Sequence, residues 1–109
     1  IKTDGTHGVV VAMQDQGAAN WYDAEARVND AYKHDSDGAK FNDWRLPTKD
    51  ELNLAYFQKE SIGGFDLSGF YWSSTENGID NAWGQIFLYG DQFGGNKGIT
   101  CYVRAVRAF

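Results

Sequence analysis

Residues 41–56, FNDWRLPTKDELNLAY, contain the clearest helix start in the chain and its single proline. Pro47 disfavours a helical conformation at the residue before it, so a helix can begin only after this point. Thr48 precedes Glu51 by three residues, which is the spacing of a capping box. In that motif the threonine hydroxyl and the glutamate carboxylate each accept a hydrogen bond from the other residue's backbone N–H. The stretch therefore predicts an extended segment that leads into a well-capped helix at residues 49–58.

Apolar residues on both sides of this helix start predict how it is buried. Leu52, Ala55 and Tyr56 recur at i, i+3 and i+4, so one face of the helix is apolar. Trp44 and Leu46 lie just upstream, and we expect them to fold beneath that face. This part of the sequence is scaffold and by itself indicates no chemistry.

Periodicity and turn residues predict the other elements and an α+β fold. The β-branched run at residues 9–12 predicts a buried strand. Apolar residues at helical spacing from Trp21 to Tyr32, preceded by Asn20 as N-cap, predict an amphipathic first helix. Glycine and aromatic residues dominate the second half, where we expect strands and loops. The strands are expected at residues 70–75, 82–88 and 99–106, and the loops between them at residues 76–81 and 89–98.

Length and charge limit the class of protein. A chain of 109 residues with 42% hydrophobic residues is expected to form one domain, residues 1–109, with a substantial core. The formal net charge of −5 disfavours nucleic acids and anionic membranes as partners. We find no apolar run long enough to insert into a membrane. Because we recognise neither an initiator methionine nor a signal peptide, we expect a domain excised from a longer protein.

Metal-binding and catalytic patterns are weak. The aspartates Asp35, Asp37 and Asp43 resemble part of a calcium loop, but the glutamate that completes an EF-hand is missing, so we expect a solvated turn and no metal. His7 and His34 are isolated, which indicates surface or capping histidines. We predict no cofactor.

The remaining reactive residues indicate structural roles. Cys101 lies in a predicted strand and is expected to be a buried thiol, because no histidine partner is evident. The hydroxyl-rich SST at residues 73–75 lacks the G-x-S-x-G context of a serine hydrolase. Arg104 and Arg107 are expected to pair with carboxylates of the same domain. We therefore predict that the protein is not an enzyme.

A ligand surface is predicted on the loops of the second half. Aromatic side chains provide stiff contact area, and Asn, Asp and Gln provide hydrogen bonds, a combination suited to both sugars and proteins. We expect the two loops to present one surface. The candidate ligand-binding residues are Asn77, Asp80, Asn81, Tyr89, Asp91, Gln92, Phe93, Asn96, Lys97 and Tyr102.

Five motifs, in order, resemble the bacterial family typified by the C-terminal domain of the Legionella collagen-like adhesin. They are DWRLPTKDEL at residues 43–52, IGGF at 62–65, YWSSTE at 71–76, NAW at 81–83 and VRAVR at 103–107. The resemblance runs from about His7 to the end of the chain.

The resemblance implies a C-type-lectin-like fold, in which two helices flank a twisted, mainly antiparallel sheet with long ligand-presenting loops. It places Trp44, Trp72 and Trp83 in the core and at loop anchors. It also implies a noncatalytic adhesion or recognition module, extracellular or on the bacterial cell surface, that binds a glycan or a cell-surface protein. The alternative is a structural domain that caps a fibre or stalk, as a homotrimer.

The named adhesin domain is associated with sulfated glycosaminoglycans and with trimers. This chain is acidic, and Lys97 is its single lysine after residue 63. Because sulfated polymers are attracted mainly by cationic side chains, the sequence disfavours that ligand.

Overall fold

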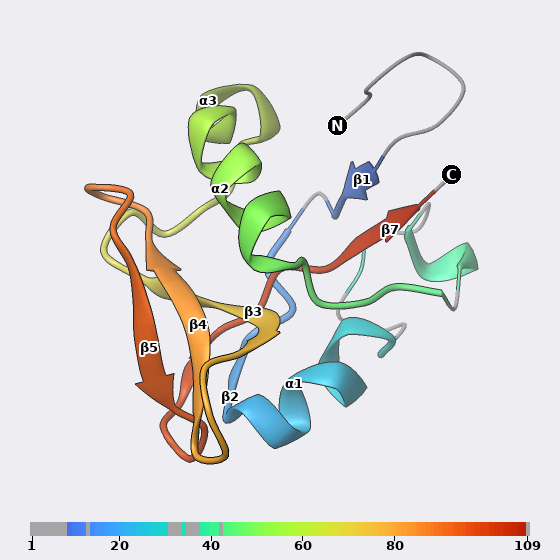
Figure 1. Ribbon diagram of the computed structural model, residues 1–109. Coiled ribbons are helices and arrows are strands. Elements are labelled where there is room, and N and C mark those ends of the chain that lie inside the picture. Colours follow the sequence, from blue (N-terminus) through green and yellow to red (C-terminus); the bar gives the residue numbers. More distant parts are fainter. Residues whose placement is uncertain (1–8, 13, 31–33, 35–37, 42, 109) are drawn as a thin grey trace.

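The computed structural model describes residues 9–12, 14–30, 34, 38–41 and 43–108 (Figure 1). The helices precede residue 63 and most of the sheet follows residue 69, so the α+β class is confirmed. The helices are α1 (Trp21–Val28), α2 (Lys49–Phe57) and α3 (Lys59–Ile62), with a 3₁₀ turn at Gly38–Lys40. The strands are β1 (Val9–Val11), β2 (Ala18–Ala19), β3 (Phe70–Glu76), β4 (Asn81–Ile86), β5 (Gln92–Asn96), β6 (Cys101–Tyr102) and β7 (Val106–Ala108).

The main sheet has five strands in the order β2-β6-β3-β4-β5. Its pairs are antiparallel except β3 with β6, which is parallel. The strands β1 and β7 form a separate antiparallel ribbon, which brings the two ends of the described chain together (Figure 1). The expectation of a mainly antiparallel sheet is therefore confirmed.

The start of α2 is built by the predicted capping box. Thr48 Oγ1 accepts a hydrogen bond from the Glu51 amide at 3.2 Å, and Glu51 Oε1 accepts one from the Thr48 amide at 2.9 Å. Arg45 adds a two-pronged ion pair to the same carboxylate, at 2.6 and 2.8 Å. The helix ends at Phe57, one residue before the predicted end, and the short α3, which the sequence did not predict, follows.

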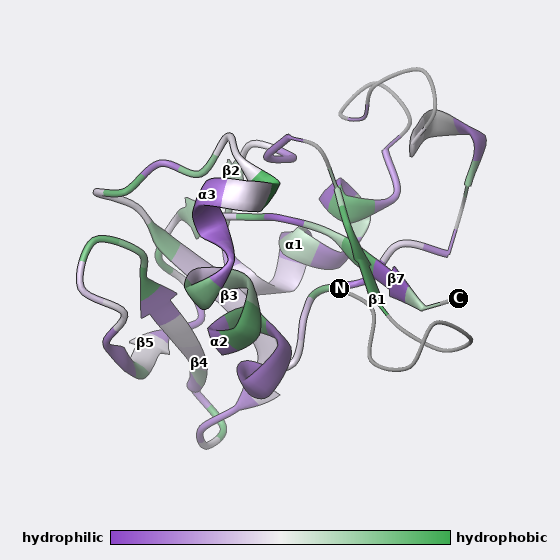
Figure 2. Cartoon of the chain, turned by 90° about the horizontal axis from the view of Figure 1, so that it is seen from above, coloured by the Kyte–Doolittle hydropathy of each residue, from purple (hydrophilic) through white to green (hydrophobic). Residues whose placement is uncertain are grey.

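Strand β3 separates two clusters of buried side chains. Tyr71 packs with Leu52, Ala55 and Phe87 on the α2 side of the sheet. Trp72 packs on the other side with residues that include Trp44 and Val28. Consecutive strand residues point to opposite faces, so β3 must be apolar on both. Figure 2 shows α1 and α2 alternating between hydrophobic and hydrophilic residues, as expected of helices with one buried side.

Several strands differ from the predicted ones because they pair with segments far away in the chain. The predicted loop at residues 89–98 contains β5, and Ala18–Ala19, predicted as part of a break, form β2. The predicted strand at 82–88 ends at Ile86. The predicted strand at 99–106 divides into β6 and β7, because the backbone between them bonds elsewhere: the Val103 amide donates to Gly17 O and the Gln16 amide to Val103 O.

The first half departs from prediction at two points. Helix α1 begins at Trp21 with Asn20 as its N-cap, as predicted, but it ends at Val28. The predicted last positions, Ala31 and Tyr32, lie outside the described residues. The predicted buried strand at residues 9–12 is a partly exposed edge ribbon, β1, in which Val10 is 38% exposed.

Two of the predicted tryptophan positions are confirmed. Trp44 and Trp72 are buried, whereas Trp83 is half-buried, with the Lys49 ammonium 3.7 Å from its ring centre. The Asn29 side chain bonds the Trp44 backbone at 2.7 and 2.9 Å and so joins the end of α1 to the segment before α2. His34 stacks on Trp44, and its Nε2 donates to the last carbonyl of α1 at 2.6 Å, so the capping role is confirmed.

No helix in the described part of the chain is both long enough and apolar enough to span a membrane. This finding applies to α1, α2 and α3, of which α2 is the longest at nine residues.

Replacing Trp44 with alanine should strongly destabilise the domain. The side chain is 5% exposed, and its Nε1 donates to Gly38 O at 3.0 Å. Loss of a buried large aromatic side chain should lower the free energy of unfolding by about 3–5 kcal/mol. Chemical denaturation measures this loss, with the exposed Tyr22→Ala variant as control. An unchanged denaturation midpoint for Trp44→Ala would contradict its assignment to the core.

The Arg45–Glu51 pair should make stability depend on acid pH. The hydrogen bond from Arg45 holds the pKa of Glu51 below the usual range of a glutamate. A carboxyl group whose pKa is lowered by folding stabilises the protein above its unfolded pKa, and that contribution is lost as pH falls through the folded pKa. Glu51→Gln should therefore be less stable than wild type at pH 7, by at most about 1 kcal/mol, since the ion pair is partly exposed. The difference in stability between Glu51→Gln and wild type, measured by chemical denaturation, should shrink as the pH falls through the folded pKa of Glu51. The control Glu60→Gln, at an exposed position, should be as stable as wild type at pH 7.

Candidate functional site

The two turns that flank β4 lie at its opposite ends, and the predicted loop at residues 89–98 runs from one end to the other as β5. The turn at residues 77–80 connects β3 to β4, and the turn at residues 87–91 connects β4 to β5 (Figure 1). When consecutive strands are antiparallel, successive turns lie at opposite ends of the strands. The expectation that both loops present one surface is therefore wrong for Tyr89 and Asp91, whereas Asn96 and Lys97 of the predicted second loop do return to the first loop.

Five of the candidate residues gather at the β3–β4 end. Asn81 pairs with Asn96 across β4 and β5, while Asn77 and Asp80 are exposed in the turn. Lys97 is different because it is only 4% exposed. Its predicted role as a ligand contact is corrected to a structural one by the contacts of its Nζ, which we describe below.

The other end carries Tyr89 and Asp91, both exposed in the β4–β5 turn. Gln92 follows them, but its side chain turns toward α2. Its Nε2 donates to Lys49 O at 2.8 Å and to Gln85 Oε1 at 3.2 Å. Gln92 therefore joins β5 to α2, and this corrects its prediction as a ligand contact.

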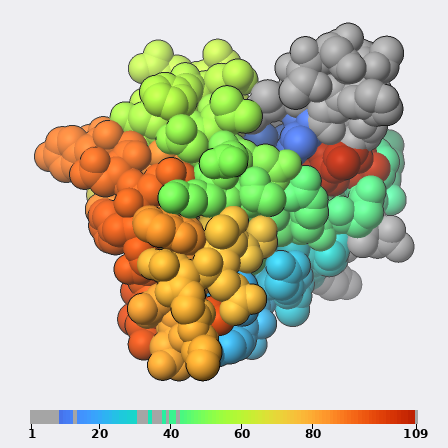
Figure 3. Space-filling model, in the orientation of Figure 1, coloured from blue at the N-terminus to red at the C-terminus, as the bar shows by residue number. Residues whose placement is uncertain are grey.

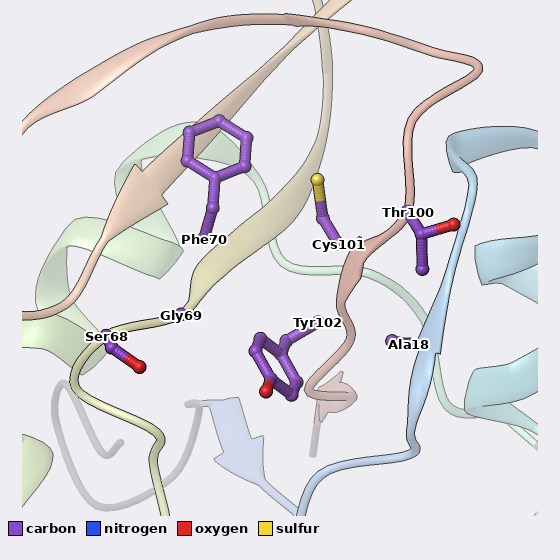
Figure 4. A pocket seen from close by; sticks show the side chains of 7 residues that line it. All are labelled: Ala18, Ser68, Gly69, Phe70, Thr100, Cys101 and Tyr102. Atoms are coloured by element: carbon purple, nitrogen blue, oxygen red, sulfur yellow. The ribbon is translucent and has the colours of Figure 1, made fainter.

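Tyr102 lines a pocket beside Phe70, and Phe93 stacks on Phe70 without lining that pocket. The Phe93 ring stacks on Phe70 with centroids 5.2 Å apart, and Tyr102 forms one wall of the pocket (Figure 4). The pocket has a volume of about 300 Å³ and lies between β6 and the segment that leads into β3. We call it the Phe70 pocket; its lining residues are Ala18, Ser68, Gly69, Phe70, Thr100, Cys101 and Tyr102.

Glycines allow the aromatic rings to lie against the backbone here. A Cβ at Gly69 would lie 2.5 Å from the Tyr102 ring, and one at Gly84 would lie 2.4 Å from the Phe70 ring. Both distances are shorter than any real Cβ contact. These two positions therefore require glycine for the rings to occupy their places.

The hydroxyl groups of Ser68, Thr100 and Tyr102 line the Phe70 pocket, and Asp66 lies beside it. Asp66 Oδ1 accepts hydrogen bonds from the Ser68 hydroxyl at 2.7 Å and from the Ser68 amide at 3.0 Å. These bonds, with one from the Tyr102 hydroxyl, lower the pKa of Asp66, and the same contact raises the pKa of Tyr102. In Figure 4 the Ser68 and Tyr102 hydroxyls lie on the same side of the pocket. The pocket thus combines aromatic walls with hydroxyl groups beside a carboxylate.

Cys101 lines the pocket as a buried thiol, as predicted. Burial raises its pKa to about 11, so the thiol is protonated at neutral pH. A nucleophilic cysteine needs a lowered pKa or a neighbouring base, and neither condition is met by the contacts described.

The described residues contain no group of three or more His, Cys, Asp or Glu side chains that could hold a metal ion. The predicted acidic turn is described only at Asp43, whose carboxylate pairs with Arg107 at 2.7 and 3.1 Å. That pair lowers the pKa of Asp43. Asp35, Asp37 and His7 lie outside the described residues.

Both C-terminal arginines pair with carboxylates of the domain, as predicted. In addition to the Arg107 pair, Arg104 Nε donates to Asp15 Oδ1 at 2.7 Å, with the guanidinium 4.0 Å from the centre of the Phe65 ring. Asp15 also accepts a hydrogen bond from the Tyr71 hydroxyl at 2.7 Å. These contacts are structural and lie within the core.

Sequence reasoning missed Asp66, Ser68 and Phe70. The segment at residues 63–69 has no periodicity, and Phe70 was assigned only as the start of a strand. The one available signal was Phe70 itself, an aromatic residue at the beginning of a strand beside Gly69.

One family matches this sequence. The sequence model described as the Lcl C-terminal domain matches residues 3–107, which is nearly the whole chain. The family inferred from the five motifs is therefore confirmed. A comparison with curated proteins gave no match.

Cys101 should be nearly inert to alkylation in the folded domain. With a pKa of about 11, roughly 0.1% of the thiol is ionised at pH 8, compared with about a quarter for an ordinary cysteine. We expect iodoacetamide to modify the native protein at least 100-fold more slowly than the urea-unfolded protein, measured by mass spectrometry. Comparable rates would contradict the burial of this side chain.

Proposed function

This chain belongs to the Lcl C-terminal domain family, and we propose that it is a noncatalytic, adhesin-type recognition module that binds a glycan through the Phe70 pocket. The observation that supports this most directly is the composition of the pocket. Aromatic rings and three hydroxyl groups line about 300 Å³ of space, and the Asp66 carboxylate bonds to two of those hydroxyls. This volume lies at the lower end of the range typical of small-ligand sites.

A saccharide ring suits this arrangement. One face of a sugar presents C–H groups that pack on an aromatic ring, and its hydroxyls need hydrogen-bond partners. Phe93 is 44% exposed beside Phe70 and offers such a ring face. The Asp66 carboxylate can accept hydrogen bonds from sugar hydroxyls, and the hydroxyls of Ser68 and Tyr102 can donate or accept them.

The pocket requires little ordering when a ligand binds. Phe70 is held between Phe93 and Trp72, whose ring centroids lie 5.2 and 5.8 Å from its own. The Trp72 Nε1 donates to Ala19 O at 3.0 Å and so fixes that ring in turn. Walls already fixed by packing lose little side-chain entropy on binding, which favours affinity.

Charge favours an uncharged saccharide over a sulfated one. The chain carries a formal net charge of −5, and the Asp66 carboxylate lies beside the pocket, bonded to Ser68 and Tyr102. The one lysine after residue 63, Lys97, is buried and ion-paired with Glu76. A sulfated chain would therefore meet carboxylates where it needs cations.

The proposal extends to the type of fold and to the location of the protein. We propose a C-type-lectin-like arrangement, supported by two main helices that precede a mainly antiparallel sheet and by a ribbon that joins the chain ends. An adhesin-type module acts outside the cell, so we place this domain at the bacterial surface or beyond it.

A structural role in a fibre or stalk is the second candidate, with a homotrimer as its form. It is favoured by exposed apolar residues near the β4–β5 turn. Phe57 and Tyr89 are 72% and 73% exposed. Tyr56 lies between them, because its ring contacts Phe57 at a centroid distance of 5.4 Å and packs against Gly90. Burial of these side chains between subunits would give a trimer at all concentrations accessible to analytical ultracentrifugation.

A glycan array probed with the purified domain, with calcium and with chelator, tests the glycan proposal. We expect saturable binding to an uncharged saccharide that weakens at least 10-fold in Phe93→Ala and at least 5-fold in Tyr102→Phe. The first variant removes the exposed ring and the second a hydroxyl group. Tyr89→Ala is the matched control, because it removes an exposed aromatic ring from the β4–β5 turn, which supplies no residue that lines the pocket.

The variants also distinguish the alternatives. Loss of binding in Tyr89→Ala with full binding in Phe93→Ala would place the ligand at the β4–β5 turn and refute the Phe70 pocket. A blank array from a folded monomer would favour a protein receptor, and a blank array from a stable trimer would favour the structural role. The chelator arm tests whether binding requires calcium.

A further inference from the structure

We propose that the far end of the β3–β4 hairpin is a second recognition surface, which binds a cationic, apolar segment of a partner protein. We call this surface the hairpin tip; it consists of Tyr22, Asp23, Glu76, Ile79, Asp80 and Ile99. The proposal is independent of the glycan site.

Large apolar side chains are unusually exposed at the hairpin tip. Ile79 is 87% exposed, Tyr22 63% and Ile99 48%. A single exposed apolar residue is common on protein surfaces. Here three exposed apolar residues come from three chain segments, and the contacts of Lys97 hold these segments together. Side chains this exposed add little to folding, but they would be buried by a partner.

Lys97 is the residue that ties these segments together. Its Nζ donates to Ile79 O at 2.8 Å and to Glu76 Oε2 at 2.7 Å, and it lies 4.5 Å from the centre of the Trp21 ring. Its backbone amide donates to Asp80 O, and its carbonyl accepts from the Trp21 amide. The β3–β4 turn, the start of α1 and the chain after β5 are thus joined.

This arrangement holds the apolar side chains on a fixed backbone. The hydrogen bonds of the turn to Lys97 use the carbonyls of Ile79 and Asp80, so both side chains are left to project outward. A turn that is already ordered loses little conformational entropy when a partner binds. Figure 3 shows the turn, in yellow-orange, beside the blue surface of α1.

The charges of the hairpin tip select the partner. Asp23 and Asp80 are exposed, and the Glu76 side chain is 59% exposed. The Lys97 side chain is only 5% exposed and is paired with Glu76, so it offers little positive charge to a ligand. Carboxylates around apolar side chains complement a segment that carries both Lys or Arg and apolar residues. A second copy of this acidic chain or a sulfated glycan would be repelled.

The hairpin tip is distinct from the Phe70 pocket. Phe70 begins β3 and Glu76 ends it, so about 20 Å of strand separates Phe70 from the turn that carries Ile79 and Asp80, although Ile99 directly precedes the pocket residue Thr100. Variants at Ile79 and Asp80 should therefore leave glycan binding intact. This makes the failure of one proposal distinguishable from the failure of the other.

Three synthetic peptides test the proposal by fluorescence anisotropy with the whole chain: one of alternating Lys and Leu, one of Lys and Ser, and one of Glu and Leu. We expect saturable one-to-one binding of the Lys/Leu peptide, at least 10-fold weaker binding of Lys/Ser, and no binding of Glu/Leu. The first comparison tests the apolar contribution and the second tests the charge.

Substitutions then locate the site. Ile79→Ser and Asp80→Asn should each weaken binding of the Lys/Leu peptide at least 5-fold. Tyr89→Ser and Asp91→Asn, the matched pair at the β4–β5 turn, should leave it unchanged. All four side chains are exposed, so each variant should keep the melting temperature of the wild type. Equal binding of Lys/Leu and Lys/Ser, or equal losses in the two pairs of variants, would overturn the proposal.

Discussion

Tyr71 and Trp72 are neighbours in the chain, both are completely buried, and they belong to different cores. This is possible only in a strand, because successive strand side chains point in opposite directions. It also requires cover on both faces of β3. Helix α2 supplies cover on the Tyr71 side, and α1 with the segment around Trp44 supplies it on the Trp72 side. The positions of the other elements follow from this two-sided burial.

The same strand places both candidate surfaces. Its first residue, Phe70, is half-buried at the edge of the core and forms a wall of the pocket. Its last residue, Glu76, is exposed and holds the ammonium of Lys97. A buried strand with partly exposed ends therefore acts as a rigid spacer between two surfaces of different chemistry. One is aromatic with hydroxyl groups, and the other is apolar with carboxylates.

The candidate site could be predicted from the sequence only in part. Phe93 and Tyr102 do lie beside the pocket, because aromatic residues in a glycine-rich region often remain partly exposed. Lys97 and Gln92 were assigned to the ligand surface as polar residues, yet both bond to other parts of the domain. Composition indicates that a residue can form hydrogen bonds, but it does not indicate with which partner. The pocket residue Ser68 was missed for the same reason, since its neighbours in space come from β2 and β6.

The resemblance carried by five motifs along the chain indicated the family and the core position of Trp72. Local signals in the sequence determined the capped start of α2, the N-cap of α1 and the core position of Trp44. Each depends on residues within a few positions of one another, where a hydrogen bond or a periodic pattern is specified by spacing. Tertiary structure decided that Gln92–Asn96 form a strand and that residues 99–106 divide between β6 and β7. It also decided that Tyr89 and Asp91 lie at the opposite end of β4 from residues 77–80, and that Lys97 is buried. These outcomes depend on pairing between segments far apart in the chain. Such pairing satisfies backbone groups whatever their side chains are, so local sequence carries little record of it.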